Sequence, residues 1–595
     1  MAVSHIMLKN VGCRFHIFDP MQRFILFLSG LFISLSVFSQ YPNTVFESSG
    51  GKESSTYSET ISFFKEAAKQ SKLVDMVEKG TTDAGYPLHV VLVSADGKFD
   101  PAEWHRKGHI VIMVNNSIHP GEPDGTDASQ LLVRDIASGK IILPGNVRLA
   151  IIPVYNIGGA LNRGPYSRVN QNGPMEYGFR GNAQNLDLNR DFTKLDSRNA
   201  SSFNAIFHWL DPHILIDNHV SDGADFQHTM TLLTSQYDKL GRPLGNFLRN
   251  RFEPAIYTHM KTKGWDLFPY VNFGAYDLSR GMTQFYDPPR YSSGYAALFQ
   301  CIGFVPETHM LKPYRERVTS TYDLMVSIAA TASQQADSLK LMKIQTREIA
   351  SKQTNFPLEW RADTTRFNTL RFMGYGRDTT LSEVTGMPRM YYRRDKPFEA
   401  DIKFLCYFNP SQFIQKPKAY IIPQGWYKVH EKLALNRVPM KRLERDILME
   451  LEVYRIESYT PSQRPYENHF RHSNVKTTTH IEKIQCLKGD YIIEMGHYTD
   501  RFVVEMLEPT GADSYFSWNY FDAILQQKEG YSNYRWEEVA AEWLRQNPQL
   551  RKQLDAKKAA EPDFAANASQ VLNWVYRNSP YFEPSFMRYP IYRML

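Results

Sequence analysis

The chain has 595 residues, of which 42% are hydrophobic and 22% charged, and its formal net charge is +6 at pH 7. A chain of this length exceeds what one compact core usually holds, so we expect two or three domains. The charge is too small to predict nucleic-acid binding, and the 4 cysteines are too few and too scattered to predict a disulfide framework or a cysteine-based metal site.

The first 40 residues contain the pattern of an export signal. Arg23 precedes the apolar run Phe24 to Phe38, which is followed by the small residue Ser39. The run is short for a membrane span, although a retained anchor is the alternative. Residues before Met21 read as an upstream misassigned start or a poorly formed leader. We therefore expect a secreted or periplasmic protein without a membrane-spanning segment once the signal is removed.

Residues 41–345 alternate between strand and helix patterns. A polar stretch over 41–56 leads into the first predicted helix. The predicted strands are 88–93, 109–114, 147–154, 214–217 and 303–306, and the predicted helices are 57–72, 127–138 and 319–352. Such alternation predicts an α/β catalytic domain with a mixed, mainly parallel sheet flanked by helices.

Residues 346–595 have a different pattern. Strand-like segments are 400–406, 419–423, 450–458, 475–484, 491–495 and 501–505, and helices are predicted over 536–546 and 549–558. This pattern predicts a β-rich accessory domain with a helical C-terminal tail. We expect its histidines, His469, His472 and His480, to lie on the surface.

One loop in the first domain combines two metal-binding side chains. His119 and Glu122 lie three positions apart, just after the predicted strand 109–114, and Asp124 or Thr126 is expected to cap the following helix. Ligands bind at the carboxyl ends of strands in open α/β sheets, so both side chains could reach one divalent cation there. Catalytic zinc usually has three protein ligands, so a third is required. The short H-x-x-E pattern is weak alone, since it also occurs by chance.

Two further side chains follow predicted strands and would share this edge of the sheet. His219 comes after the strand 214–217 and is the natural third ligand, with Asp217 available to orient its imidazole. Glu307 follows the strand 303–306, where a carboxylate beside a zinc-bound water could take a proton and pass it to a leaving amine.

The polar loop 178–192, GFRGNAQNLDLNRDF, lies between these segments in the chain. It contains Arg180, Asn189 and Arg190. Guanidinium groups match the geometry of carboxylates, so this loop is a candidate substrate-binding element. A charged, solvated loop is the alternative.

Four motifs in this order resemble the zinc metallocarboxypeptidase family, to which carboxypeptidase A belongs. They are HPGE at 119–122, DLNRDF at 187–192, NH at 218–219 and VPETH at 305–309. The resemblance covers roughly residues 45–345. Later segments weakly resemble the C-terminal parts of bacterial secreted members.

The resemblance implies that His119, Glu122 and His219 bind zinc, one ion per chain. It also implies that Glu307 is the general acid/base and that Arg180 polarises the scissile carbonyl and stabilises the oxyanion.

By the same comparison, Asn189 and Arg190 would bind the terminal carboxylate of the substrate. Tyr286, Tyr291 and Tyr295 compete for the place of the family's mobile tyrosine.

We therefore expect a secreted zinc metallocarboxypeptidase that hydrolyses the C-terminal peptide bond of peptides with a free carboxylate, through a zinc-activated water. Two enzymes on the same fold are alternatives, an N-acyl amino acid deacylase of the aspartoacylase type and a hydrolase of cell-wall peptides containing D-residues. A non-catalytic peptide- or glycan-binding protein is a further alternative. The sequence leaves the preferred terminal residue, the oligomeric state and the role of the C-terminal region open.

Overall fold

The computed structural model describes residues 41, 43–270 and 278–595. The predicted export signal in residues 21–40 lies outside the described residues. Within those ranges, no helix has both the length and the apolar character needed to cross a bilayer.

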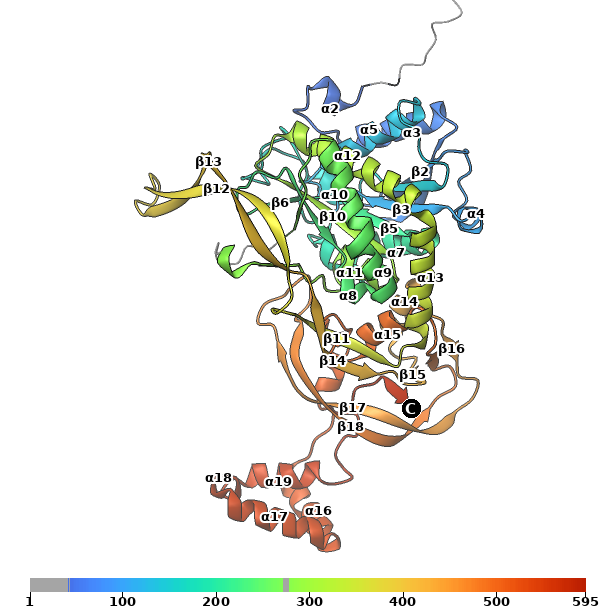
Figure 1. Cartoon of the computed structure of the whole chain (residues 1–595). Coiled ribbons are helices and arrows are strands. Elements are labelled where there is room, and N and C mark those ends of the chain that lie inside the picture. Colours follow the sequence, from blue (N-terminus) through green and yellow to red (C-terminus); the bar gives the residue numbers. More distant parts are fainter. Residues whose placement is uncertain (1–40, 42, 271–277) are drawn as a thin grey trace, which may run out of the picture. The chain divides into compact units, whose positions relative to one another are not determined.

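A mixed sheet with helices on its faces organises the first part of the chain (Figure 1). The order of its strands is β1-β2-β4-β3-β5-β10-β7-β8, and β6 pairs with β10. The strands are β1 (Val74–Thr81), β2 (Pro87–Ser94), β3 (Ile110–Asn115), β4 (Val147–Ile152), β5 (Ile214–Asp217), β6 (His219–Ser221), β7 (Met230–Thr234), β8 (Phe268–Pro269) and β10 (Ile302–His309). The pairs β3–β4, β3–β5, β5–β10, β6–β10 and β7–β8 are parallel, whereas β1–β2, β2–β4 and β7–β10 are antiparallel. The predicted mixed, mainly parallel sheet is confirmed.

The helices of this part are α2 (Val45–Ser48), α3 (Tyr57–Gln70), α4 (Pro101–Arg106), α5 (Asp124–Ala137), α6 (Ile157–Leu161), α7 (Arg198–Leu210), α8 (Tyr237–Leu240), α9 (Arg242–Phe247), α10 (Glu253–Thr262), α11 (Ser292–Leu298), α12 (Tyr314–Gln334) and α13 (Ala336–Lys352).

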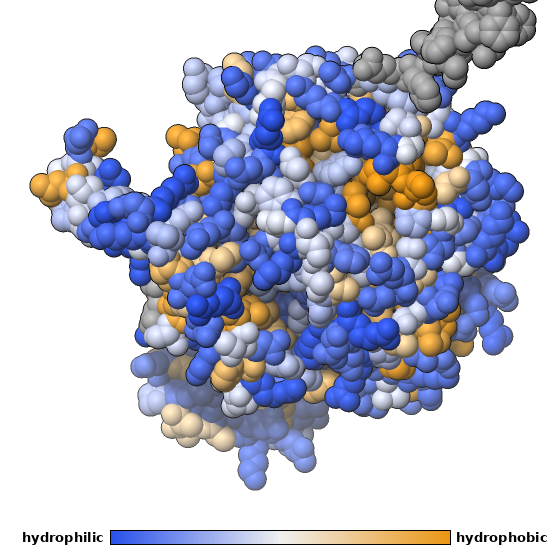
Figure 2. All heavy atoms as spheres, turned by 45° about the horizontal axis from the view of Figure 1, so that its top comes forward, coloured by the Kyte–Doolittle hydropathy of each residue, from blue (hydrophilic) through white to orange (hydrophobic). Residues whose placement is uncertain are grey.

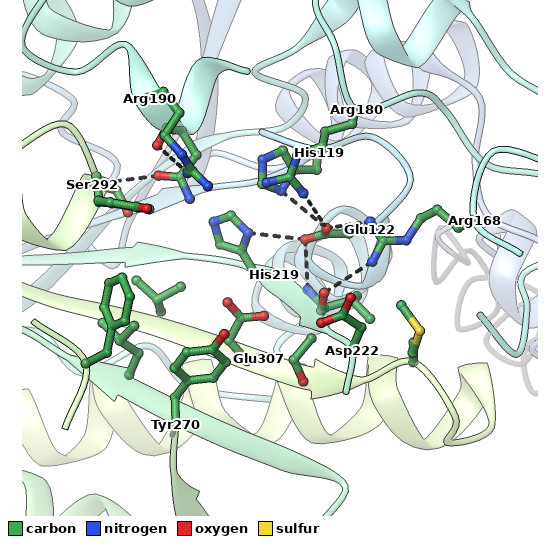
Figure 3. A pocket seen from close by; sticks show the side chains of 18 of the residues that line it. His119, Glu122, Arg168, Arg180, Arg190, His219, Asp222, Tyr270, Ser292 and Glu307 are labelled. Carbon is green, nitrogen blue, oxygen red and sulfur yellow. Dashed lines mark hydrogen bonds and ion pairs between the residues drawn. The ribbon is translucent and has the colours of Figure 1, made fainter. Parts of the chain in front are cut away.

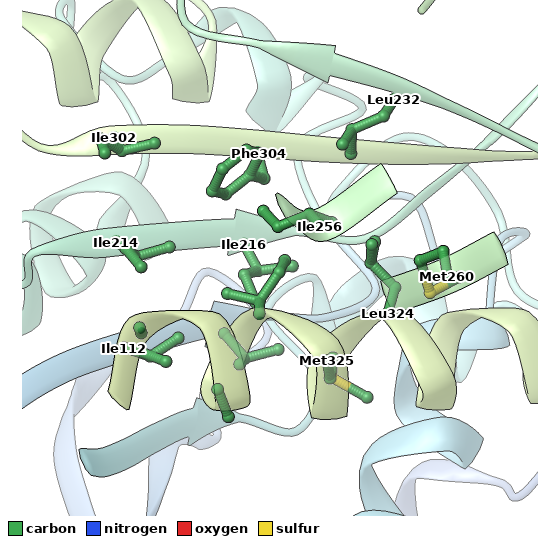
Figure 4. Packing of buried hydrophobic residues seen from close by; sticks show 14 of the residues in the cluster. Ile112, Ile214, Ile216, Leu232, Ile256, Met260, Ile302, Phe304, Leu324 and Met325 are labelled. Atoms are coloured by element: carbon green, nitrogen blue, oxygen red, sulfur yellow. The ribbon is translucent and has the colours of Figure 1, made fainter. Parts of the chain in front are cut away.

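Strand β3 shows why both faces of the sheet are covered. All its residues are buried, and alternate side chains point to opposite faces. Ile112 packs in a cluster with side chains of α10 and α12, including Ile256 and Leu324 (Figure 4). Met113 belongs to a second cluster that includes Phe207 of α7. The continuous apolar pattern of β3 is therefore explained by its burial on both faces of the sheet.

The C-terminal region contains long antiparallel strands and ends in short helices. Its strands are β11 (Asn355–Ala362), β12 (Asn368–Leu381), β13 (Pro388–Leu405), β14 (Phe408–Gln415), β15 (Ala419–Ile422), β16 (Lys441–Arg442), β17 (Ile447–Pro461), β18 (His472–Cys486), β19 (Tyr491–Glu494) and β20 (Tyr592–Met594), and β9 (Met282–Thr283) of the preceding part pairs with β13. Its helices are α14 (Tyr427–Leu435), α15 (Asp500–Leu507), α16 (Asn533–Gln546), α17 (Pro548–Ala560), α18 (Pro562–Ala565) and α19 (Ala568–Arg577). The predicted β-rich character and the helical tail are confirmed.

The hairpin of β12 and β13 projects from a face of the molecule that is mainly hydrophilic (Figure 2). Val384 at its tip is 94% exposed.

The second hydrophobic cluster crosses the predicted domain boundary near residue 345. It joins Phe207 and Phe299 of the first part to Phe502, Phe521 and Tyr589 of the C-terminal region. The two regions therefore share a core, and the division at 345 stays a prediction.

Several local predictions were wrong. Residues 501–505 lie in α15 rather than in a strand, because apolar side chains recur at helical spacing over the whole of 500–507. The predicted helix 319–352 is two helices that meet at Gln335, and no glycine or proline marks that break. His472 is buried and contacts Asp522 at 2.7 Å, so the surface prediction fails for this histidine.

The expected cap of the helix after the His119 loop was also wrong. Pro123 occupies the N-cap position of α5, and no side chain caps it. Asp124 lies 3.2 Å from Arg317 instead, and the Thr126 hydroxyl donates to the Pro153 carbonyl. The residues 41–56 include the short helix α2 rather than loop alone.

Glu253 of α10 is a buried carboxyl that makes folding stability depend on pH. Its Oε2 accepts a hydrogen bond from the Tyr237 hydroxyl at 2.5 Å, and burial raises its pKa from 4.5 to about 7, although Tyr237 and Arg249 oppose the rise. The unfolded chain loses this proton near pH 4.5, so the folded state binds more protons between that pH and about 7. The free energy of unfolding should therefore fall as pH rises through this window.

In the Glu253→Gln variant this fall in the free energy of unfolding should be smaller by about 3 kcal/mol, because glutamine does not titrate. Urea denaturation of both proteins from pH 5 to 8 measures it. Parallel pH dependence in the two proteins would contradict the assignment. Glu348→Gln, at an exposed ion pair with Lys352, is the control.

Candidate active site

The turn after β3 brings His119 and Glu122 together. The Glu122 backbone N–H donates to the His119 carbonyl at 2.8 Å, which closes the turn. A Cβ at Gly121 would lie 2.5 Å from Cδ of Arg168, so a larger residue there would displace that side chain. Arg168 itself is held by its 2.7 Å bond from Nη1 to Glu122 Oε1.

Sheet register places His219 beside Glu307. Strands β6 and β10 run parallel, and these two residues are direct partners in that pair. Both therefore lie at the edge of the sheet where β3 also ends. In Figure 3 the Glu307 carboxylate lies below the His219 imidazole.

The donor atoms of His119, Glu122 and His219 fit a metal ion. One ligand atom from each lies within 4.8 Å of the others. The Nδ1 atoms of the two imidazoles lie 3.2 and 3.1 Å from the Glu122 carboxylate oxygens, so both face the same point. His119 Nδ1 is buried and makes no hydrogen bond to any described residue, which leaves its lone pair available. Two imidazoles and a carboxylate suit zinc.

Carboxylates hold the opposite nitrogen of each imidazole. His119 Nε2 lies 3.0 Å from Asp187 Oδ1, and His219 Nε2 lies 3.1 Å from Asp217 Oδ2. Metal-binding histidines usually donate their second N–H to a carboxylate, which fixes the tautomer and the ring. The expected orienting role of Asp217 therefore has a matching contact, and Asp187 plays the same part for His119.

Burial and neighbouring charges shift the pKa values of the two glutamates in the cavity in opposite directions. Burial alone would raise the pKa of Glu122, but Arg168 and His119 outweigh it and hold that pKa well below its usual value. For Glu307, burial raises the pKa to about 8. The positive charge of His219 opposes this rise, and the negative charge of Glu122 adds to it. Glu122 is thus an anionic carboxylate between the two imidazoles, whereas Glu307 is a carboxyl that exchanges a proton near neutral pH.

A single 3-10 turn, Leu188–Arg190, presents Asn189 and Arg190 to the same cavity. The Asn189 Oδ1 accepts from the Ser292 N–H at 3.4 Å. The Arg190 guanidinium stacks on the Tyr291 ring at 4.3 Å from its centroid.

The cavity has a volume of about 480 Å³ and brings the predicted site residues together. The members on its wall are His119, Glu122, Arg180, Asn189, Arg190, His219 and Glu307. Of the three candidate tyrosines, Tyr291 lines the cavity. Tyr286 stacks instead on Phe408, and the buried Tyr295 hydroxyl donates a hydrogen bond to Asn436 Oδ1 at 2.9 Å.

Sequence reasoning missed three residues of the site. Arg168 bonds Glu122 from a loop without a recognisable motif. Asp187 opens the DLNR motif and holds both His119 and Arg180, the latter at 3.0 Å. Tyr270 lines the cavity beside Glu307 (Figure 3), although it was not among the three candidate tyrosines. The motif itself was a signal for Asp187, whereas no local signal existed for Arg168.

Comparisons with known proteins find similar sequences and similar solved structures. Residues 60–215 match the family model described as zinc carboxypeptidase. Carboxypeptidase 2 from Trichophyton rubrum is 21% identical over 491 residues, covering 79% of this chain and 85% of that protein. The Trichophyton equinum protein of the same name is 21% identical over 429 residues, covering 68% and 73%.

Among solved structures, carboxypeptidase A from Helicoverpa armigera is similar with a TM-score of 0.37 and 15% identity, covering 53% of this chain and 82% of that one. The metallo-carboxypeptidase from Pseudomonas aeruginosa in complex with (2-guanidinoethylmercapto)succinic acid has a TM-score of 0.35 and 14% identity, covering 47% and 68%.

Proposed function

We propose that this chain, which carries a zinc carboxypeptidase domain matched over residues 60–215, removes the C-terminal residue from peptides. The observation that carries the proposal is the grouping, in one cavity, of a candidate metal triad, the proton-exchanging Glu307 and the arginines Arg180 and Arg190.

His119, Glu122 and His219 would hold one zinc ion. A bound zinc ion supplies Lewis acidity, which makes water a stronger acid and polarises a carbonyl. Glu307 is partly buried at the cavity wall, and it would accept a proton from the attacking water and return it to the leaving amine.

Arg180 is the candidate electrostatic stabiliser. Its guanidinium lies 3.7 Å from Glu122 Oε1 and 2.9 Å from Asp187 Oδ2. These carboxylates hold a permanent positive charge at the rim of the triad, where negative charge develops on the carbonyl oxygen during attack.

Asn189 and Arg190 are the candidate receptors for the free carboxylate of the substrate. A guanidinium forms charge-assisted hydrogen bonds with a carboxylate, and an internal peptide bond carries no such negative charge. The apolar side chains Leu233, Phe285 and Val305 also line the cavity. A peptide that ends in an apolar residue is therefore the first substrate to test.

The test compares N-acylated peptides that end in phenylalanine with a free carboxylate or an amide. We expect hydrolysis of the free acid, release of phenylalanine and loss of activity on chelation of the metal. Faster turnover of N-acyl amino acids than of peptides would favour the deacylase, and turnover restricted to purified peptidoglycan fragments would favour the cell-wall hydrolase. Zinc binding without turnover of any of these would favour a binding protein.

Export is part of the proposal. The arginine and the apolar run within residues 21–40 support it. Expression of the full chain followed by N-terminal sequencing of the protein outside the cytoplasm tests it, and retention of the uncleaved chain inside the cell would contradict it.

A further inference from the structure

A turn from the C-terminal region reaches the loop that carries Asn189 and Arg190. The turn comprises residues 462–471, which connect β17 to β18, and we call it the β17–β18 turn. At its tip, Tyr466 and His469 exchange two backbone hydrogen bonds of 2.8 and 3.1 Å. Glu467 and Asn468 between them have φ angles of 48° and 70°. Two consecutive residues with positive φ define a tight hairpin turn of type I′.

The left-handed conformation is unusual for Glu467. Asparagine tolerates it, whereas glutamate has no local hydrogen bond that offsets the steric cost. Strain of this kind persists where surrounding contacts over-determine the conformation, and it is concentrated at functional sites. The contacts of this side chain are therefore informative.

Two side chains at the tip of the β17–β18 turn contact the loop 187–190 directly. Glu467 Oε2 accepts a hydrogen bond from the Asp187 backbone N–H at 2.8 Å. The Tyr466 hydroxyl accepts one from Arg190 Nε at 3.0 Å. The turn thus contacts both ends of the DLNR motif at 187–190. Its first residue, Asp187, contacts His119, and its last, Arg190, would bind the substrate.

The turn is itself supported from behind. The Tyr466 ring stacks on Trp518, with centroids 6.1 Å apart and an interplanar angle of 16°. His469 Nε2 lies 2.7 Å from Asp196 Oδ2. Trp518 is fully buried, so one face of the partly exposed Tyr466 ring packs against the core.

Most of the Arg190 guanidinium is engaged by described residues. Its Nε is engaged by Tyr466, its Nη1 donates to the Asn189 carbonyl at 2.8 Å, and its face covers Tyr291. Within the part of the chain that the structure describes, Nη2 makes no hydrogen bond, so it can donate to a ligand in the cavity. Fixing a long side chain before binding reduces the entropy lost when the ligand arrives.

We propose that Tyr466 and Glu467 are positioning residues, contributed by the C-terminal region, which hold Arg190 and the Asp187 backbone in the geometry that receives the substrate's terminal carboxylate. This inference rests on the proposed carboxypeptidase function. It gives the β-rich region a defined role in substrate recognition.

The first experiment is steady-state kinetics of the full chain carrying Tyr466→Phe, which removes the hydroxyl and keeps the stacked ring. We expect KM for the free-acid peptide to rise about tenfold, as for loss of one hydrogen bond to a charged group, with kcat within about twofold. The preference for the free acid over the amide should fall by the same factor. An unchanged KM, or an equal loss of kcat on both substrates, would overturn the proposal.

A matched control is Tyr491→Phe. Tyr491 also accepts a hydrogen bond from an arginine, Arg442, at 2.5 Å and stacks with it, but this pair is on the exposed surface away from the cavity. We expect wild-type kinetics from this variant. Glu467→Ala should raise KM as Tyr466→Phe does, whereas Glu467→Gln, which keeps an acceptor for the Asp187 N–H, should restore it.

Binding separates failure of this inference from failure of the proposed function. Calorimetric titration of the zinc-loaded protein with N-acetylphenylalanine and with its amide requires no turnover. If the wild type hydrolyses no peptide yet prefers the acid, and Tyr466→Phe loses that preference about tenfold, the positioning role stands and the reaction assignment fails. If the variant keeps the preference in both assays, the positioning role is wrong whatever the reaction.

Discussion

Replacing Glu307 by glutamine should reduce peptide hydrolysis about 1,000-fold while leaving the bound zinc in place. The amide keeps the size of the side chain but cannot accept the proton of the attacking water. The pair of β10 with β6 keeps position 307 beside His219, so the substitution leaves the metal triad intact. Turnover of the free-acid peptide, with zinc content measured on the same sample, gives both quantities.

The pH dependence provides a second readout of the same variant. Burial raises the pKa of Glu307 to about 8 in the metal-free chain, and a cation at the neighbouring triad would lower it. A base acts when deprotonated, so kcat/KM of the wild type should rise with pH along an acidic limb below 8, and the variant should lack this limb. Glu253→Gln, another buried glutamate with a raised pKa, is the matched control and should retain the limb. Equal rates for wild type and Glu307→Gln would remove Glu307 from the mechanism.

The second large effect is expected from His219→Ala. This change removes one of the three proposed metal donors and leaves the Asp217 carboxylate, 3.1 Å from His219 Nε2, without its imidazole partner. Loss of an outer partner alone costs roughly 10- to 100-fold in metal affinity, so loss of a ligand should exceed about 100-fold. Zinc should then be lost on dialysis, and hydrolysis should fall to background.

The control for this variant is His105→Ala. His105 Nε2 lies 2.8 Å from the Leu210 carbonyl, and the residue is not part of the cavity wall. It should keep full zinc and full activity. Stoichiometric zinc in His219→Ala after dialysis would show that the metal site has been misplaced.

Much of the site could be predicted because its residues follow strands. His119, His219 and Glu307 each come at or just after an apolar, β-branched segment, and parallel strands bring their carboxyl ends to one edge. The pattern that marks the strand thereby also marks where the neighbouring polar side chain will lie.

Contacts between distant segments could not be predicted in this way. Tyr466 and Arg190 are 276 positions apart, and nothing near either residue in the sequence indicates the other. The hydrogen bond from Arg168, which lies in an irregular loop, to Glu122 could not be predicted for the same reason. The error at 501–505 has a different cause, because a short apolar run suits a strand and one buried helix face equally well.

The shared hydrophobic cluster limits how this protein can be divided. Phe207 and Phe299, on the side of the sheet opposite α12, are covered by aromatic side chains that come from beyond residue 500. A fragment that stops after α13 would expose this apolar surface to water, which favours aggregation over folding. The helix-flanked sheet and the β-rich region should therefore be kept together when this protein is truncated or recombined.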